Sequence, residues 1–336
     1  MLALPTEDSQ DVKLESVVCA ICNSSSSRLI GQGKDREYQT VNNVFQVVEC
    51  NCCGLRYLNP RPTVEELGRI YPSNYHAYNI RSRGESMEVL SWVTRLRHRI
   101  YSRRFSNVFS ELDGAAEIRL LDVGCGDGWM LDLYRLAAPN PLLTYGVDFN
   151  AEVCQIAESF GHKVFCGRFE DLSLDGQFDI INLSHVIEHV SDPASIASKS
   201  FSLLRPGGLF VVETPNWRTW EGILLEKGDW GAYHIPRHWN LFDATTLQRL
   251  GEQAGLKLVR VIYNPAPVHW IWSFNNISIR KGGPLGRLGG QIFSPLSGFG
   301  GGLKAFLMLS IFTLFDLTLK LFTGRTSNMM MIFRKV

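Results

Sequence analysis

Two pairs of cysteines near the N-terminus have the spacing of metal ligands. Cys19 and Cys22 form one Cys-x-x-Cys pair, and Cys50 and Cys53 form a second pair after 27 intervening residues. Four thiolates at this spacing complete a tetrahedral shell around Zn²⁺ with no open position, so the sequence predicts a structural zinc site. Cys52 is a spectator in this interpretation, although it could exchange with Cys50. The alternatives are unliganded thiols and a redox pair, and no βα unit follows either pair to support the second.

A glycine-rich segment in the middle of the chain has the pattern of a loop that binds a nucleoside. Its acid and its glycines are Asp122, Gly124, Gly126 and Gly128. Glycines let the backbone approach a ligand closely, and open α/β sheets bind ligands where a strand ends in such a loop. The dinucleotide fingerprint would need its third glycine at Trp129, so we expect a different nucleoside ligand. Asp122 is placed to receive an ammonium group of that ligand.

A second acid, Asp148, ends the next apolar run, 20 residues after Gly128. A carboxylate at this point can accept hydrogen bonds from both ribose hydroxyls, and its charge disfavours a 2′-phosphate. The alternative is that both acids and the glycines are turn residues of an α/β protein without a ligand.

The chain around these acids alternates short apolar runs with helical segments. Strands are expected at 118–123, 142–147, 163–166, 178–183, 209–213, 256–262 and 329–333, and helices at 151–160, 193–204 and 245–254. Strands that alternate with helices are typical of a mostly parallel sheet with helices on both faces. We therefore expect a Rossmann-like α/β fold of seven strands, with a zinc-ribbon-like module before it and a helical insertion before the last strand.

Composition shifts divide the 336 residues into five segments. They are a zinc-binding module at 1–62, a helical linker at 63–110, a core at 111–262 with a substrate lid at 215–243, a hydrophobic helical insertion at 263–326, and a last strand at 327–336. With 34 basic and 33 acidic residues, the chain has no global basic field, so we expect no nucleic-acid partner. The N-terminal residues lack the pattern of a secretory signal, which predicts a cytoplasmic protein.

The most apolar segment is 303–323. Its longest uncharged run, 305–315, has 11 residues, which is short of the roughly 20 that cross a bilayer. We therefore expect a buried helix or one that pairs two copies of the chain. The alternative is an interfacial helix that touches a membrane or a lipid-linked substrate.

The motifs from 118 to 262 resemble those of the class I S-adenosylmethionine-dependent methyltransferases. The matching segments are 122–128, 147–149, 167–172, 178–181 and 204–209. This resemblance implies a sheet with one antiparallel edge strand and S-adenosylmethionine at the carboxyl ends of its first two strands. The implied cofactor-binding residues are Asp122, Gly124, Cys125, Gly126, Gly128, Asp148, Phe149, Phe169, Glu170 and Tyr75, the last of which, with Tyr78, resembles the tyrosines that close over the cofactor.

The cysteine pairs and the segment 54–62 resemble the N-terminal zinc-binding module of bacterial methyltransferases that include deoxysugar C-methyltransferases. In that module Tyr57 and Arg61 are candidates for contacting substrate. The same family carries an aromatic-x-Glu-His segment in its lid, which aligns His238 here as a general base and puts Arg237 where the glutamate stands. The alternative is a structural histidine that caps the following helix.

A second polar group follows the fourth strand. Helical spacing would bring His185, Glu188 and His189 together, and the segment resembles a Glu-x-x-Glu-His segment that binds a divalent metal in ubiquinone-pathway O-methyltransferases. The alternative is an acid–imidazole pair that orders the loop. Glu188, His189 and His238 are therefore our catalytic candidates.

These features together predict an enzyme that methylates a hydroxyl or an activated carbon of a small molecule. A sugar, a glycolipid or a secondary metabolite is the first expectation for the substrate. A lipid-linked or quinone substrate at the membrane surface is the alternative, and a non-catalytic zinc and methyltransferase-like scaffold is a second one.

Overall fold

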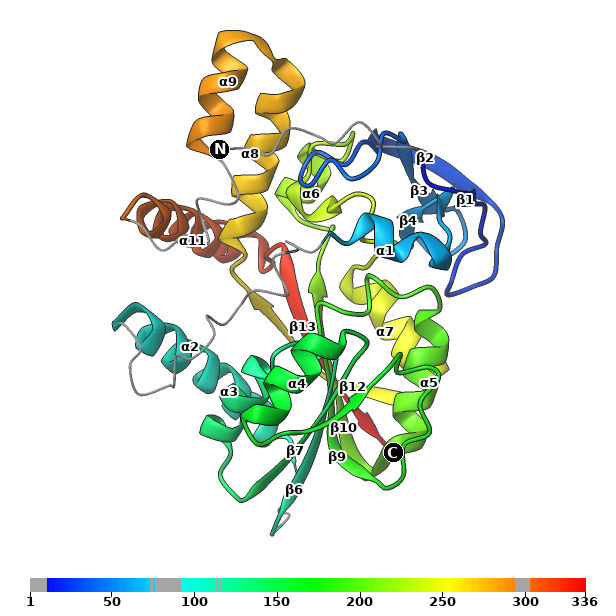
Figure 1. Cartoon of the computed structure of the whole chain (residues 1–336), viewed down its shortest axis with the longest axis vertical. Coiled ribbons are helices and arrows are strands. Elements are labelled where there is room, and N and C mark those ends of the chain that lie inside the picture. The colour runs from blue at the N-terminus through cyan, green and yellow to red at the C-terminus, as the bar shows by residue number, and fades with distance from the viewer. Residues whose placement is uncertain (1–10, 73–74, 76–91, 113, 115, 294–302) are drawn as a thin grey trace.

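The computed structural model describes residues 11–72, 75, 92–112, 114, 116–293 and 303–336. A seven-stranded sheet forms its centre (Figure 1), in the order β12-β13-β10-β9-β6-β7-β8. The strands are β6 (Ile118–Val123), β7 (Leu142–Asp148), β8 (Lys163–Cys166), β9 (Phe178–Ser184), β10 (Leu204–Pro215), β12 (Leu256–Asn264) and β13 (Asn328–Lys335). All seven strands expected from the sequence are present, and the predicted fold class is confirmed.

The direction of the last strand corrects one expectation. β13 runs antiparallel to both of its neighbours, β10 and β12. The antiparallel strand therefore lies inside the sheet, and β12 forms the edge. Five strands, from β10 to β8, are parallel.

Helices cover both faces of this sheet because successive strand residues point to opposite sides. Leu120 and Ile180 pack in a cluster with α2 (Trp92–Phe109) and α3 (Trp129–Ala137). Leu121 and Ile181, one residue further along each strand, pack with α5 (Pro193–Leu203) and α7 (Ala244–Gln253). The remaining core helix is α4 (Ala151–Ser159).

Side-chain caps set where several of these helices begin. Asn150 accepts hydrogen bonds from the backbone at the start of α4, and Asp192 does the same at α5. Asp243 and Thr246 form a reciprocal capping box at α7. Because Asp243 caps α7, the alternative that His238 caps the following helix is wrong.

The N-terminal module and the predicted lid share one sheet. Its order is β11-β4-β3-β2, and β11 comes from the lid. The elements of this region are β1 (Leu14–Glu15), β2 (Ser27–Gly33), β3 (Phe45–Cys50), β4 (Arg56–Leu58), β5 (Arg61–Pro62), η1 (Val64–Glu66), α1 (Leu67–Ile70), α6 (Trp220–Leu224), η4 (Gly231–Tyr233) and β11 (Asn240–Leu241). The module is thus fastened to the loops above the central sheet rather than tethered by a linker alone.

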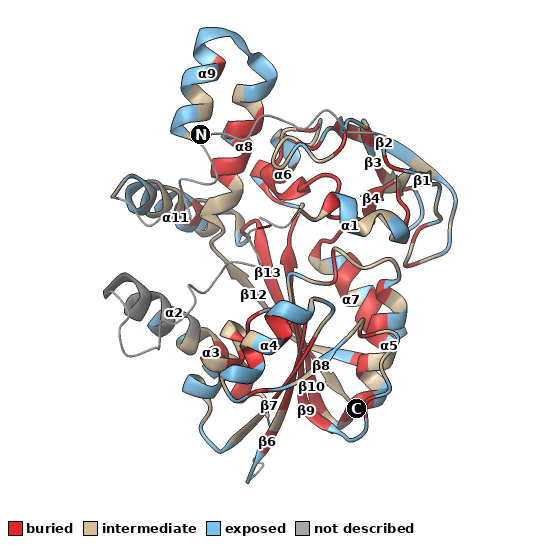
Figure 2. Cartoon of the chain, in the orientation of Figure 1, coloured by how far each residue is buried: buried red, intermediate tan, exposed pale blue. Residues whose placement is uncertain are grey.

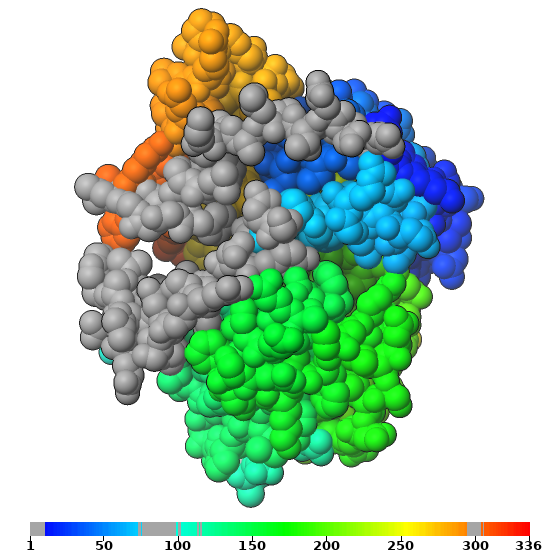
Figure 3. Space-filling view, in the orientation of Figure 1, coloured from blue at the N-terminus to red at the C-terminus, as the bar shows by residue number. Residues whose placement is uncertain are grey.

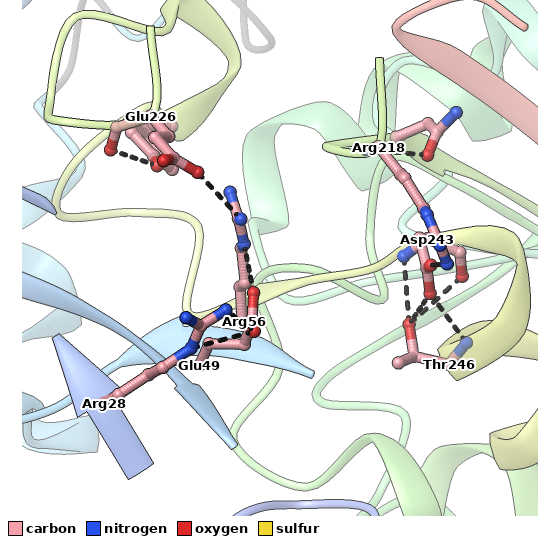
Figure 4. Close-up of polar contacts among 9 residues, drawn as sticks. Arg28, Glu49, Arg56, Arg218, Glu226, Asp243 and Thr246 are labelled. Carbon is pink, nitrogen blue, oxygen red and sulfur yellow. Dashed lines mark hydrogen bonds and ion pairs between the residues drawn. The ribbon is translucent and has the colours of Figure 1, made fainter. Parts of the chain in front are cut away.

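Ion pairs reinforce this junction (Figure 4). Arg56 is buried and donates to Glu49 at 2.9 Å and to Glu226 of the lid at 2.9 Å. Its guanidinium also lies 3.7 Å from the centre of the Trp217 ring. A buried arginine held on three sides in this way fixes the lid against β4.

The insertion between β12 and β13 consists of α8 (Pro267–Lys281), α9 (Gly283–Ile292) and α11 (Leu303–Thr323). Figure 2 shows α9 and α11 largely exposed beside the core. Only 6% of the window Phe306–Thr323 is buried, so the expectation of a buried helix is wrong. The same 18-residue window has a mean hydropathy of 1.7, so by length and composition alone this helix could cross a membrane. The sequence interpretation had excluded a membrane span because the uncharged run has only 11 residues.

Candidate functional site

One cavity of about 580 Å³ opens where the parallel strands end. Its walls are the loops after β6, β7, β8 and β9, together with α1 and a residue of the lid. Its lining includes Val123, Gly124, Asp148, Phe149, Gly167, Phe169, Glu170, His185, His189, Tyr71, Tyr75 and Trp239. The carboxyl edge of a parallel sheet is the usual ligand site of such folds.

The glycine loop and the second acid meet at one end of the cavity. The Asp148 carboxylate accepts hydrogen bonds from the backbone N–H of Gly126 at 3.0 Å and of Asn150 at 2.9 Å. Gly124 adopts φ +74°, and a Cβ there would lie 2.5 Å from Cγ2 of Val186, so glycine is strongly favoured at this position. Burial raises the pKa of Asp148. Hydrogen bonds from the hydroxyl groups of a ligand would act in the opposite direction and favour the ionised carboxylate.

Asp122 is buried and is not among the residues that line the cavity. It is 2% exposed and accepts a hydrogen bond from the Asn182 amide at 2.6 Å. Burial raises the pKa of Asp122 to about 7, and the charge of Asp148 adds to this effect. The hydrogen bond that positions the Asp122 carboxylate therefore comes from a residue of the protein, Asn182. Cys125, Gly126 and Gly128 also shape the loop from outside the lining.

The aromatic wall of the cavity comes from the loops after β7 and β8. Phe149 is 60% exposed at the rim, whereas Phe169 is buried. Lys199 of α5 donates to the carbonyls of Phe169, Glu170 and Leu172 at 2.5, 3.1 and 2.5 Å, which holds the loop in place. No local motif marks Lys199, so sequence reasoning missed it.

Histidines gather at the other end. The ring centres of His189 and His238 are 4.5 Å apart, and those of His238 and His234 are 4.9 Å apart. The Nδ1 atoms of His189 and His238 bond to the carbonyls of Arg237 and Ala232 at 3.1 and 2.8 Å. A carbonyl only accepts, so Nδ1 of His238 carries its proton and its neutral Nε2 has a lone pair, whereas Nδ1 of His189 also lies 2.8 Å from the Tyr71 hydroxyl, which can donate or accept. Burial lowers the pKa of both histidines, which keeps them neutral.

Of the three catalytic candidates, His189 lines the cavity, whereas His238 and Glu188 are not among its lining residues. Burial alone would raise the pKa of Glu188, but the hydrogen bond from His185 and the electrostatic attraction of that ring outweigh burial and lower the pKa to about 2. Glu188 accepts from His185 at 3.2 Å and from Thr214 at 3.0 Å. One donor atom each of Glu188, His189 and His238 lie within 4.8 Å of one another.

The N-terminal module adds two acids that sequence reasoning missed. Arg237 donates to both carboxylate oxygens of Asp35 at 3.1 and 2.9 Å, and both side chains are fully buried. Next to this pair, His234 contacts Glu37 through Nδ1 and Tyr75 through Nε2, the latter at 3.3 Å. Asp35 and Glu37 lie about 200 residues from Arg237 and His234 in the sequence, so no local motif indicated these contacts.

The tyrosines and Arg61 occupy distinct places. The hydroxyl of Tyr71 lies 2.8 Å from Nδ1 of His189, and Tyr71 and Tyr75 both line the cavity. Arg61 bonds to the carbonyl of Ser191 and lies over the ring of Trp239. Tyr57 is packed in the core. Tyr78 lies outside the described residues.

A family model described as a methyltransferase domain matches residues 93–261, half of the chain. The chain belongs to this methyltransferase family. It is an S-adenosylmethionine-dependent enzyme, and the matched residues include the glycine loop, Asp148 and the loops after β8 and β9.

Curated relatives agree with this assignment. The methyltransferase is 30% identical over 184 residues to a ubiquinone biosynthesis O-methyltransferase of Nitrobacter winogradskyi, a match that covers 50% of this chain and 69% of the relative. It is 32% identical over 175 residues to the enzyme of the same name from Cereibacter sphaeroides, covering 47% and 68%.

Solved structures include a methyltransferase of Archaeoglobus fulgidus, at 17% identity and a TM-score of 0.44, covering 73% of this chain and all of that one. Another, from Mesorhizobium loti, has 16% identity and a TM-score of 0.43, covering 69% and 97%.

The four predicted zinc ligands of the methyltransferase come together. Their sulfur atoms all lie within 4.8 Å of one another, with 3.3 Å between Cys19 and Cys53 and 3.5 Å between Cys22 and Cys50. Zinc–sulfur bonds of about 2.3 Å place the sulfurs of a tetrahedron about 3.8 Å apart, so the donor set fits Zn²⁺. Cys52 is exposed and instead lies 3.3 Å from the Ser24 hydroxyl.

The two knuckles have the same backbone geometry. The residue that follows each pair, Asn23 or Gly54, has a positive φ. Its N–H donates to the carbonyl of the first cysteine of the pair, at 2.9 Å in the first knuckle and 3.0 Å in the second. This turn directs both sulfurs of a pair to one side.

Proposed function

We propose that this methyltransferase methylates a hydroxyl group on a small polar ring, either a sugar or a hydroxylated aromatic ring. The observation that carries the proposal is that one cavity joins the Asp148 loop to the group of Tyr71, Tyr75 and His189. A nucleoside cofactor at the first end and a hydroxylated ring at the second would face each other within about 580 Å³. The names of the curated relatives support an oxygen acceptor.

The cofactor half of the cavity suits S-adenosylmethionine. We assign the ribose hydroxyls to the Asp148 carboxylate and the adenine to the wall of Phe149 and Phe169. Gly124 gives the backbone close access to the ligand, and Asp122 and Gly126 hold the loop from behind. When bound, S-adenosylmethionine supplies an electrophilic methyl group, and the acceptor hydroxyl gives up its proton as its oxygen forms the new bond to carbon.

We assign the acceptance of that proton to His189. In this assignment Nδ1 of His189 keeps its proton, which the Arg237 carbonyl and the Tyr71 hydroxyl can accept, so the Nε2 lone pair is the basic site, and the neutral state of the ring suits a general base. The ionised carboxylate of Glu188, beside it, stabilises the imidazolium that forms. His238 packs against His189 and serves as a positioning residue.

Glu188, His189 and His238 also form a donor set that a divalent cation could enter. Both carboxylate oxygens of Glu188 already accept a hydrogen bond, from His185 and Thr214. We therefore favour proton transfer over metal binding for this group.

The N-terminal module completes the acceptor end, and we propose that its four cysteines bind one structural Zn²⁺. Asp35 and Glu37 fix Arg237 and His234 and so set the position of the lid. An ion that orders this module would order the acceptor site as well. Paired cysteines that hold a metal instead of forming disulfides are typical of intracellular proteins, so we propose an intracellular location.

A lipid-linked or quinone acceptor is the second candidate. The exposed apolar helix α11 and the names of the curated relatives favour it. Both candidates present a hydroxyl to the same end of the cavity.

The test is methyl transfer from isotopically labelled S-adenosylmethionine to a panel of sugars, phenols and hydroquinones, read by mass spectrometry. With an accepted substrate, His189→Gln should reduce kcat by about 10²–10⁴-fold without changing the affinity for S-adenosylmethionine. His269→Gln is the matched control, because His269 is a half-buried neutral histidine that does not line the cavity. Equal kcat values for His189→Gln and wild type would refute the assignment.

A further inference from the structure

The outer face of α11 consists of large apolar side chains that no described part of the chain covers. They are Leu307, Ile311, Leu314, Leu317, Leu321 and Phe322. Leu307, Ile311, Leu314 and Leu321 lie on one stripe, since helix residues three, four or seven apart share a face. Leu321 and Phe322 are 85% and 83% exposed. Contiguous exposed apolar faces of this kind mark interaction surfaces.

The inner face of α11 fixes which side points outward. Trp270 of α8 stacks on Phe312 and meets Phe315 edge-on, with ring centres 6.4 and 5.0 Å apart. Phe274 stacks on Phe312 at 5.8 Å. The helix is therefore packed onto α8 in a defined orientation, as Figure 1 shows for the two elements.

All three charged residues of α11 bond to the rest of the protein. Asp316 accepts from the Trp270 indole at 2.8 Å and from the backbone of Ala266 at 2.6 Å. Lys320 donates to the Tyr263 carbonyl at 2.7 Å, and Lys304 donates to the Gln291 carbonyl at 2.7 Å. The Thr318 hydroxyl, on the outer side, donates to the Leu314 carbonyl within the helix. The outer face of α11 thus presents few polar groups that could hydrogen-bond to water.

Charge is distributed very unevenly between the insertion and the rest of the chain. The segment 265–327 contains six of the 34 basic residues but only one of the 33 acidic residues, Asp316, which gives it a net charge of +5 and leaves −4 for the remainder. Asp316 is 3% exposed. Of the six basic residues, Arg280 forms an ion pair with Asp229, whereas Lys304 and Lys320 lie on the apolar helix α11 and Arg325 follows it.

We infer that the insertion α8–α9–α11 docks the enzyme on an anionic lipid bilayer, with the outer face of α11 entering the interface. An apolar helix face flanked by basic residues binds such a surface through both burial and attraction to the headgroups. A second copy of the chain is a weaker match, since two insertions of +5 would repel each other. The three charged side chains of α11 are bonded to α8, α9 and β12, so the helix stays attached to the rest of the enzyme. In this inference the helix therefore lies on the membrane with the enzyme attached to it. The inference goes beyond the proposed function and does not require a lipid-linked acceptor.

The test is co-sedimentation of the full chain with vesicles of phosphatidylcholine alone or phosphatidylcholine mixed with phosphatidylglycerol. Wild type should sediment with the anionic vesicles and far less with the neutral ones. The double variant Ile311→Glu/Leu314→Glu should lose at least about tenfold in vesicle affinity, since each side chain leaves the apolar region. Leu136→Glu is the matched control, because Leu136 is an exposed leucine on α3, away from the insertion.

Two further measurements separate the outcomes. Calorimetry with S-adenosylmethionine should give the same affinity for wild type and all variants, so a failure of the cofactor site is seen independently of membrane binding. Lys281→Gln/Arg287→Gln should reduce the preference for anionic vesicles. The inference is overturned if wild type sediments with neither vesicle, or if the double variant binds as well as wild type. A wild-type dimer that the double variant dissociates, without vesicle binding, would assign the face to a second copy instead.

Discussion

The substitution Gly124→Ala tests whether the glycine loop forms the cofactor site. Gly124 has φ +74° and lines the cavity, and the added Cβ would lie 2.5 Å from Cγ2 of Val186. Since Val186 also lines the cavity, relief of this contact changes the shape of the cavity wall. The change should therefore weaken ligand binding while leaving the protein folded.

The expected loss of folding free energy in Gly124→Ala has two parts. An alanine at this φ costs roughly 1–2 kcal/mol of folding free energy. The close contact with Val186 adds overpacking, which typically costs about 1–3 kcal/mol. The sum is less than the total stability of most domains, so the variant should fold. A displaced Val186 that removes about 1.4 kcal/mol of binding energy would weaken the affinity for S-adenosylmethionine tenfold.

Two variants separate backbone strain from the contact. Gly207 has φ +77° and open space where its Cβ would lie, so Gly207→Ala should lose the strain energy and keep full cofactor affinity. Gly124→Ala/Val186→Ala removes the atom that collides and should recover most of the affinity.

The assays are urea unfolding for stability and calorimetry for the affinity of S-adenosylmethionine. Wild-type affinity in Gly124→Ala, measured on a folded sample, would refute the placement of the cofactor beside this loop. Equal loss of affinity in Gly207→Ala would show that the effect is not local to the cavity.

Four other changes probe the remaining assignments. Asp148→Asn should weaken S-adenosylmethionine binding at least about tenfold in calorimetry, since a charged acceptor of hydrogen bonds is lost; unchanged affinity would contradict the ribose assignment. Cys22→Ser should remove one zinc equivalent by elemental analysis and destabilise the N-terminal module, whereas Cys52→Ser should retain the metal. Burial raises the pKa of Glu221 to about 8 from 4.5, so the fold loses stability as the pH rises between these values. Glu221→Gln should therefore stabilise the protein by a few kcal/mol at pH 9 and little below pH 4.5 in urea unfolding, and the same gain at both pH values would contradict this. His238→Ala should lower kcat while preserving cofactor affinity, and an unchanged kcat would rule out its positioning role.

Much of the cofactor half could be predicted from the sequence. The acids and glycines from Asp122 to Asp148 lie within 27 residues, and their spacing reflects the geometry of a strand, a turn and a helix. The same holds for the cysteine pairs, because each knuckle is a local turn. The seven strands were also predictable, since short apolar runs between helical segments report burial on both faces.

The residues of the proposed acceptor half are brought together only by the tertiary structure. Asp35 meets Arg237 across 202 residues of sequence, and no periodicity or motif records such a pairing. The pairing of the lid strand β11 with β4 and the contact between Glu37 and His234 likewise join segments that lie far apart in the sequence.

The same division applies to the insertion. The apolar residues of 303–323 were evident from the sequence, but whether they face the core or the solvent depends on packing. Asp316 and Lys320 interrupt the apolar run in sequence, yet in the fold they bond to α8 and β12. Residue type and spacing thus determined the local turns and the cofactor loop. Only the three-dimensional packing, through contacts between distant segments, decided the acceptor end and the exposed face of α11.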